Sequence, residues 1–314
     1  MKIHLGTEKI AEIKNAVVTS GTFDGVHLGH QQILDRLKQL ADEIDGETVL
    51  ITYWPHPRLV LKPWDHSLQL LSTFPEKANQ LEKHGVDHLI KIPFTQEFAL
   101  MSPEDYIRVI LHDRIGTNKL VIGYDHRFGK DRSGGLEELQ HYADKYKYTV
   151  EEIPRQDIEE IGISSTKTRR ALEIGDVAAA NAFLGRPYSI SGVVAKGEQK
   201  GRQLGFPTAN IKIKENYKLI PADGVYAVKV CNKFKKHDGM LNIGHRPTVG
   251  GDHKTIEVHI FEFDDNIYDT EISIEFIERI REEQKFESLD QLKHQLEEDE
   301  KQVKEILVNY KETV

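Results

Sequence analysis

The sequence predicts two domains of different class. The first is an α/β domain built on a parallel sheet, and the second is a mainly-β, six-stranded antiparallel barrel with a terminal helix. The length of 314 residues suits about two domains of about 150 residues each. The first half alternates apolar strand patterns with amphipathic helix patterns. In the second half, strand patterns follow one another, with Gly and Asp at the turns.

The first half contains four short apolar segments that are typical of buried strands, at 16–22, 48–53, 88–92 and 119–123. Apolar residues recur at helical spacing in the segments 30–45, 75–84, 103–112 and 135–146. Strands alternating with helices form right-handed βαβ units and a parallel sheet. Ligands of such sheets bind beyond the carboxyl ends of the strands.

Two helices and a short linker are expected at the end of this half. Ser164 or Ser165 is a suitable N-cap for a helix that runs to Ile174 and is stopped by Gly175. An Ala-rich helix follows over 176–184, and Arg186 and Pro187 read as a linker. We therefore expect an N-terminal domain of residues 1–185 and a C-terminal domain of residues 186–314.

The second half is expected to form strands at 190–195, 208–213, 224–231, 240–244, 254–263 and 270–277. In the fifth of these, Ile256, Val258 and Ile260 alternate with polar residues, so Glu257 should face away from the aliphatic side. Ser288 and Gln291 form a capping-box signature that begins the terminal helix.

Composition narrows the class of protein. The net charge of −9 argues against a general electrostatic grip on nucleic acid. The single cysteine, Cys231, excludes an internal disulfide and a multi-cysteine zinc site. No apolar run approaches the ~18 residues of a membrane span, and the N-terminus lacks a secretion signal. We expect a cytoplasmic protein that binds small molecules, neither nucleic acid nor membrane, as a monomer or weak homo-oligomer.

The segment Gly21–His30 carries the strongest functional signal. His27 and His30 flank Gly29 at the start of a predicted helix, after Asp24 and Gly25. Helix N-termini present unpaired N–H groups to anions, glycines allow close backbone approach, and imidazoles donate hydrogen bonds to phosphate oxygens. The segment follows the strand at 16–22, and Tyr124–Gly129 follows the strand at 119–123, so both should lie at one edge of the sheet.

Two further segments favour phosphate binding. In Ile163–Arg170, hydroxyl groups and basic residues gather at a helix start. In Gly197–Asn210, three glycines accompany Lys200 and Arg202, and Thr208 and Asn210 offer neutral oxygens suited to a hydrated Mg²⁺ that also contacts phosphates. The chain has no Gly-x-x-x-x-Gly-Lys-Ser/Thr sequence, so this loop is not a common P-loop.

These segments resemble the prokaryotic bifunctional riboflavin kinase/FMN adenylyltransferase family, also called FAD synthetases, over nearly the whole length and in the family's order. The N-terminal half is similar to its Rossmann-like nucleotidyltransferase domain through Gly25–His30, Gly123–Gly129 and Ile163–Arg169. The C-terminal half is similar to its riboflavin kinase barrel through Gly201–Asn210, Gly224–Val228, Asn242–Thr248, Glu257–Ile260 and Arg281–Phe286.

The resemblance implies that the barrel phosphorylates riboflavin to FMN with ATP. Thr208 and Asn210 would hold Mg²⁺ and the ATP phosphates, and Glu257 would accept the proton of the flavin hydroxyl. Arg281 and Glu283 would wall the flavin side. The remaining binding residues implied for this site are Gly197, Lys200, Gly201, Arg202, Gly205, Pro207 and Asn242.

The resemblance also implies that the N-terminal domain joins FMN to AMP from a second ATP, giving FAD and releasing pyrophosphate. The FMN phosphate is already an anion, so this step needs no base. His27 and His30 would contact the triphosphate, and Asp125 the ribose. The other binding residues implied are Asp24, Gly25, Gly29, Ser164, Ser165, Thr166 and Arg169.

The chain departs from the family at His126, where an aromatic residue is usual, and at Trp54, where the family more often has a smaller or acidic residue. Three other functions compete. A nucleotidyltransferase with another acceptor, such as pantetheine phosphate or nicotinate mononucleotide, would leave the barrel motifs unused. A flavin- or nucleotide-sensing module would lack the phosphate-handling residues that are present here. A tRNA synthetase is disfavoured by the short chain, its acidic balance and the absence of an anticodon-binding region.

Overall fold

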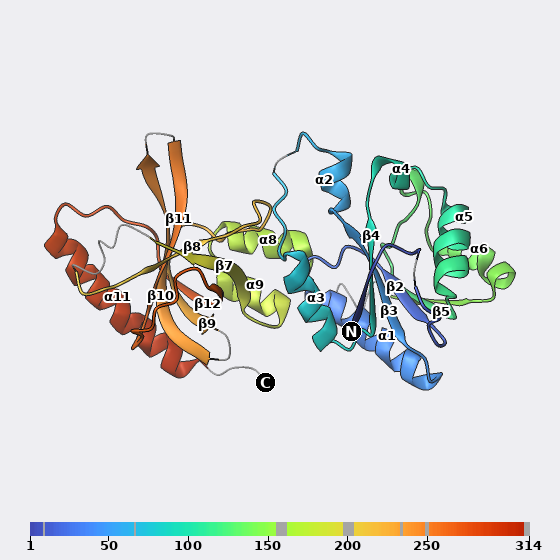
Figure 1. The fold of residues 1–314 in the computed structure, drawn as a ribbon, viewed down its shortest axis with the longest axis horizontal. Coiled ribbons are helices and arrows are strands. Elements are labelled where there is room, and N and C mark those ends of the chain that lie inside the picture. The colour runs from blue at the N-terminus through green and yellow to red at the C-terminus, as the bar shows by residue number, and fades with distance from the viewer. Residues whose placement is uncertain are drawn as a thin grey trace. The chain divides into compact units, whose positions relative to one another are not determined.

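The computed structural model describes residues 1–8, 10–65, 67–154, 162–196, 204–232, 235–248 and 251–310, with side chains left out at 246–248 and 251–253. The chain forms two compact units, Met1–Ser165 and Thr166–Val314 (Figure 1). The first is α/β and the second is mainly β, so the predicted fold class is confirmed. The domain boundary near residue 185 stays a prediction.

The first unit is built on a six-stranded sheet in which every pair is parallel, with the order β1-β4-β3-β2-β5-β6. The four predicted strands are its centre, and two unpredicted strands form its edges. The strands are β1 (Lys2–Leu5), β2 (Val17–Ser20), β3 (Thr48–Trp54), β4 (His88–Pro93), β5 (Lys119–Gly123) and β6 (Thr149–Ile153).

Two apolar cores cover the two faces of this sheet because successive side chains of a strand point to opposite sides. Val17 and Leu50 pack with α1 (Leu28–Glu43) and α3 (Phe74–Lys83). Val18 and Ile51 pack on the other face, with η1 (Tyr106–Ile115) and α6 (Leu136–Tyr146). Figure 1 shows this layering. The short helices are α2 (Pro57–Leu61), α4 (Gln96–Ala99), α5 (Pro103–Asp105) and η2 (Lys130–Arg132).

The predicted helix at 103–112 differs in kind from the observed one. The chain makes only the short α5 in the α-helical pattern and then continues as η1, a π-helix that ends at Gly116 in the left-handed conformation. The wider turn of a π-helix shifts the side chains away from the period of 3.6 residues on which the prediction rests.

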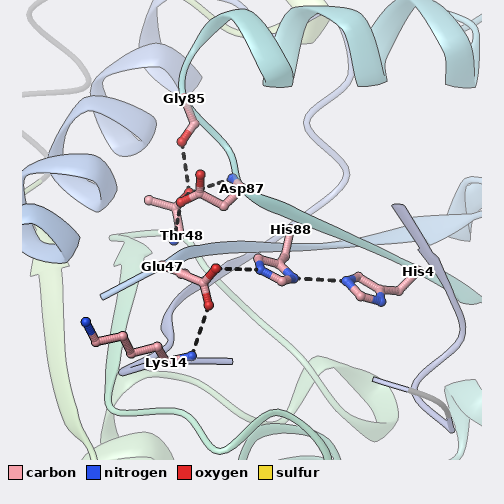
Figure 2. A network of polar contacts seen from close by, with 7 residues as sticks. All are labelled: His4, Lys14, Glu47, Thr48, Gly85, Asp87 and His88. Atoms are coloured by element: carbon pink, nitrogen blue, oxygen red, sulfur yellow. Dashed lines mark hydrogen bonds and ion pairs between the residues drawn. The ribbon is translucent and has the colours of Figure 1, made fainter. Parts of the chain in front are cut away.

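Polar contacts fasten the amino ends of β1, β3 and β4, away from the strand ends where ligands are expected. His4 Nε2 lies 3.0 Å from His88 Nδ1, and His88 Nε2 lies 3.3 Å from Glu47 Oε1 (Figure 2). Thr48 Oγ1 donates to Asp87 Oδ2 at 2.9 Å. The His4 and His88 rings are stacked, and burial, followed by the charge of His88, lowers the pKa of His4. This network gives the otherwise exposed edge strand β1 a fixed position.

Two helices precede the barrel and pack within the second unit. The backbone N–H of Ala222 donates to the carbonyl of Leu172 in α8 (Ser165–Glu173). Asn181 in α9 (Val177–Leu184) donates to the Phe276 carbonyl at 2.8 Å. These bonds explain why the compact unit begins at Thr166.

The second unit is a closed six-stranded barrel in the order β10-β11-β8-β7-β12-β9, with every pair antiparallel. Val303 and Leu307 of the terminal helix α11 (Leu289–Asn309) pack on the barrel residues Val225, Ala227 and Ile277. The strands are β7 (Tyr188–Ala195), β8 (Ala209–Lys212), β9 (Gly224–Asn232), β10 (Lys235–Thr248), β11 (Gly251–Ile260) and β12 (Glu271–Arg281).

Among the described residues, no helix combines the length and the hydropathy that crossing a membrane requires.

Candidate active sites

A strained turn links β2 to α1 in the first unit. Phe23 and Val26 both have a φ of 45° and Gly25 has a φ of 82°, which is the left-handed region that residues other than glycine rarely adopt. Backbone strain of this kind persists where the surrounding structure enforces it, and it concentrates at functional sites. The turn places His27 at the N-cap of α1, so the predicted helix start is confirmed.

His27 and His30 form a stacked pair at this helix start, with ring centroids 3.7 Å apart. The backbone N–H of His30 donates to His27 Nδ1 at 3.3 Å. A ring nitrogen that accepts carries no proton, so neutral His27 must carry its proton on Nε2. Burial, then the charges of His27 and Lys77, hold the pKa of His30 well below its ordinary value. His30 is therefore a neutral hydrogen-bonding group near pH 7.

Asp24 holds the turn from inside. Its carboxylate is 3% exposed and accepts hydrogen bonds from the backbone N–H groups of Leu71 and Ser72 at 3.1 and 3.2 Å. The N–H of Gly25 in turn donates to Ser72 Oγ at 3.2 Å. The carboxylate thus cross-links the turn to the segment before α3, and its described contacts fix backbone geometry.

Lys77 of α3 lies beneath the same turn. It is 3% exposed, and its Nζ donates to the Thr22 carbonyl at 2.8 Å and to Thr52 Oγ1 at 3.2 Å. Burial, opposed by Asp24 and assisted by Lys91, lowers the pKa of Lys77 to about 8. Lys77 is not among the site residues predicted from the sequence. One signal could have identified it. Phe74, Ala78 and Leu81 form the apolar face of the helix at positions i, i+4 and i+7, and Lys77 occupies position i+3 on that same face.

The two polar segments expected at one sheet edge do lie together. β2 pairs with β5, and Oγ of Ser20, the last residue of β2, lies 2.8 Å from Nε2 of His126, which follows β5. His126 Nδ1 is inaccessible to solvent and has no partner among the described residues. Burial, followed by the charge of Arg132, lowers the pKa of His126 to about 4. Asp125 beside it is exposed.

The hydroxyl segment 163–170 divides between the two units. Ser165 belongs to the first unit, begins α8, and donates from Oγ to the Asp24 carbonyl at 2.9 Å. Thr166 and Arg169 belong to the second unit, and Ser164 precedes the helix. The helix start is confirmed, whereas phosphate binding by these four residues stays a prediction.

The barrel gathers its predicted residues across three neighbouring strands. Glu257 of β11 stands opposite Asn210 of β8 on one side and Asn242 of β10 on the other. Thr208 Oγ1 donates to Glu257 Oε2 at 3.2 Å. Glu257 is partly exposed between buried Ile256 and Val258, as the alternation predicts.

These barrel residues supply hydroxyl, amide and carboxylate oxygens, the donors that Mg²⁺ prefers. Among the residues with described side chains, no cluster of three or more His, Cys, Asp or Glu could hold a metal by itself. The oxygens of Thr208, Asn210 and Glu257 fit Mg²⁺, which is commonly bound by one or two protein groups together with substrate phosphates.

His259 was not singled out from the sequence, although the period of two places it on the face of Glu257. Its Nδ1 lies 2.7 Å from the Pro207 carbonyl, so Nδ1 carries the proton and fixes the residue before Thr208. Gly205 has a φ of 89°, a conformation suited to glycine. The predicted loop residues Gly197, Lys200, Gly201 and Arg202 lie outside the described part of the chain.

Arg281 and Glu283 stand at the end of β12. The Arg281 guanidinium binds the buried Asp299 carboxylate of α11 through Nε at 2.9 Å and a terminal nitrogen at 2.7 Å. Glu283 covers Gly244, where an added Cβ would meet its carboxylate. Arg281 is thus engaged with the terminal helix, and its place on the flavin side stays a prediction.

Comparison with known proteins assigns a family to each half. The FAD synthetase family model matches residues 9–167, and the riboflavin kinase family model matches residues 184–307. A bifunctional riboflavin kinase/FMN adenylyltransferase of Listeria monocytogenes is 38% identical over 291 residues, 91% of this chain and 90% of the relative. One from Bacillus subtilis is 37% identical over 306 residues, 95% of this chain and 94% of the relative.

A solved structure extends the match to the whole fold. It is a crystal structure of a Streptococcus pneumoniae protein described as a macrolide-efflux protein, which is 31% identical with a TM-score of 0.88. The likeness covers 98% of this chain and 99% of that one. Taken with the family models and the two relatives, it leads to one conclusion: the chain belongs to the bifunctional riboflavin kinase/FMN adenylyltransferase family.

Proposed function

We propose that this chain makes FAD in two steps at two separate sites. The barrel transfers the γ-phosphate of ATP to riboflavin, and the N-terminal unit joins the resulting FMN to AMP from a second ATP, releasing pyrophosphate. One observation carries the proposal: two polar clusters of different chemistry lie in two different units, each inside the part matched by a different family model.

In the barrel, Glu257 orients the riboflavin hydroxyl and accepts its proton late in the reaction. An ordinary carboxylate is a weak base for an alcohol, which suits a loose transition state that makes little demand on the base. Thr208 and Asn210 hold Mg²⁺, which when bound supplies charge neutralisation at the ATP phosphates. The Thr208–Glu257 hydrogen bond and the facing positions of Asn210 and Glu257 support these roles.

In the N-terminal unit, the attacking FMN phosphate is already an anion, so the residues need only position it and stabilise charge. His27 donates from Nε2 to the triphosphate, and the neutral His30 lies stacked on it. The α1 N-terminus adds backbone N–H groups that favour anions. We propose that the other residues predicted to bind the nucleotide in this step do so as well, namely Asp24, Gly25, Gly29, Asp125, Ser164, Ser165, Thr166 and Arg169.

The barrel's remaining contacts are proposed on the same basis. Gly205, Pro207 and Asn242, together with Gly197, Lys200, Gly201 and Arg202, bind the nucleotide, and Arg281 and Glu283 wall the flavin. We further propose a cytoplasmic monomer or weak homo-oligomer whose partners are small molecules and not nucleic acid or membranes. Light scattering with and without ATP and riboflavin tests the assembly state.

Separating the two activities tests the proposal. We expect His27→Ala to lower FAD formation from FMN and ATP about 100-fold or more, by loss of one preorganised donor, and to leave riboflavin phosphorylation unchanged. We expect Glu257→Gln to lower riboflavin phosphorylation about 100-fold or more and to leave FAD formation from supplied FMN unchanged. Exposed His141→Ala and Glu271→Gln serve as matched controls.

Chromatography that separates riboflavin, FMN and FAD after incubation with ATP and Mg²⁺ measures both steps. Loss of both activities in either variant would contradict two independent sites. Tight riboflavin binding with no turnover in the unmodified protein would support the sensing module instead. Turnover of FMN without turnover of riboflavin would leave only the nucleotidyltransferase.

A further inference from the structure

The buried ammonium of Lys77 is an unusual feature of the first unit. Lysines are almost never fully buried unless a charged partner compensates them, because desolvating the ammonium costs several kcal/mol. Lys77 is 3% exposed, and the two hydrogen bonds described for its Nζ go to neutral oxygens, the Thr22 carbonyl and Thr52 Oγ1. This desolvation cost is met beside the candidate nucleotide site, which suggests that the buried ammonium is kept for its function there.

The two acceptors tie three elements together. Thr22 opens the strained turn, Thr52 lies near the end of β3, and Lys77 comes from the centre of α3. Thr52 Oγ1 also donates to the Thr22 carbonyl at 3.4 Å, so the three groups form a closed triangle. The turn that follows Thr22 holds Phe23 and Val26 in the left-handed region. Fixing the Thr22 carbonyl therefore fixes the point where this turn begins.

Charged and titratable groups face Lys77 from each element packed around it. Asp24 of the turn favours the ammonium, whereas Lys91 of β4 disfavours it. His30 of α1 is close enough for the Lys77 charge to lower the pKa of the imidazole. The Trp54 ring of β3 lies with its centroid 5.4 Å from Nζ, a distance at which a cation is attracted to the ring.

We propose that Lys77 is a positioning residue for adenylyl transfer: its ammonium holds the Thr22 carbonyl and thereby sets the turn that aligns His27 and His30. The inference rests on the proposed role of the two histidines. Lys77 acts through them and is not assigned a contact with the substrate.

The test compares Lys77→Met, which keeps the side-chain length and removes the charge, with Lys83→Met at an exposed position of the same helix. We expect Lys77→Met to lower kcat for FMN adenylylation about 100-fold, the cost of a small misplacement of catalytic groups. Riboflavin phosphorylation by the same molecules should not change. The unfolding temperature of the first unit should stay the same or rise, because a buried charge has been removed.

Two further measurements separate positioning from mere structure. Adenylylation by the unmodified protein should fall as the pH rises through about 8, where Lys77 loses its proton, and the Lys77→Met variant should lack this alkaline limb. The double variant with His27→Ala should lose less activity than the product of the two single losses, because the lysine acts in part through that histidine.

Unchanged adenylylation in Lys77→Met would overturn the inference. So would a lower unfolding temperature that accounts for the lost activity, or additive losses in the double variant. Full activity of His27→Ala by itself would instead remove the proposed role of the histidine, so the two failures can be told apart.

Discussion

His126 should make the first unit sensitive to acid, and His126→Phe should remove the part of that sensitivity that this imidazole causes. The imidazole is held between Ser20 and a buried environment, and burial, followed by the charge of Arg132, lowers its pKa from the ordinary 6.5 to about 4. In the unfolded chain the same group titrates near the ordinary value. At pH values between the folded-state and the unfolded-state pKa, the unfolded state binds a proton that the folded state does not bind. The free energy of unfolding therefore decreases as the pH falls.

The magnitude follows from the two pKa values. At about pH 7.5 the imidazole is neutral in both states and contributes almost nothing to the pH dependence. At about pH 5 the unfolded chain is mostly protonated and the folded state is not, which costs ~2 kcal/mol of the free energy of unfolding. Phenylalanine at this position lacks the proton-binding group. It loses the contact with Ser20 Oγ, worth about 1 kcal/mol at any pH.

Tryptophan fluorescence in urea gives a selective assay, because Trp54 and Trp64 are the two tryptophans of the chain and both lie in the first unit. We expect the variant to be less stable than or equal to the natural protein near pH 7.5, and to gain ~2 kcal/mol relative to it near pH 5. An equal difference at both pH values would refute the reasoning. FMN adenylylation near pH 7.5 should persist in the variant, since His126 is not among the groups assigned to the chemistry.

Two more predictions concern stability. Asp299→Ala should destabilise the second unit by about 3 kcal/mol, because the partly buried guanidinium of Arg281 loses its carboxylate partner. Thermal inactivation of riboflavin phosphorylation measures this, with exposed Glu298→Ala as the control and with adenylylation expected to keep its original midpoint. Thr48→Val should cost the first unit about 1–3 kcal/mol, because the Asp87 N–H, which donates to Thr48 Oγ1 at 2.8 Å, loses its acceptor. Urea denaturation followed by tryptophan fluorescence measures it, and an unchanged midpoint would mean that water replaces the hydroxyl.

The sequence is most informative about fold where burial is continuous. The segments at 48–53 and 119–123 read as strands because both faces of a central parallel strand are buried. The edge strands β1 and β6 are not predicted by this pattern. Lys2–Leu5 is mostly exposed, and Thr149–Ile153 contains two glutamates, so neither offers an apolar run. Their position depends on pairing with β4 and β5, which a local pattern cannot express.

Some features of the candidate sites could be predicted from the sequence, and others could not. Glu257 could be placed on its strand face from alternation, and His27 at its helix start from glycine spacing, because both depend on neighbours in sequence. The pairing of Asp24 with Ser72 and of Lys77 with Thr22 joins residues about 50 positions apart. The sequence marks Asp24 as a ligand-binding candidate, which stays a prediction, and the structure adds its hydrogen bonds to Leu71 and Ser72.

The charge placed at each site matches the nucleophile that the proposed reaction uses. A riboflavin hydroxyl must lose a proton, and the barrel presents the partly exposed carboxylate of Glu257 beside a hydroxyl donor. The FMN phosphate has no proton to lose and would be repelled by such a group. In the first unit the Asp24 carboxylate is buried and accepts hydrogen bonds from two backbone N–H groups, and the Lys77 ammonium lies close to the histidine pair. One chain can thus run two ATP-dependent steps because the barrel places a carboxylate where a hydroxyl must lose its proton, whereas the histidine pair offers hydrogen-bond donors to a phosphate that needs no base.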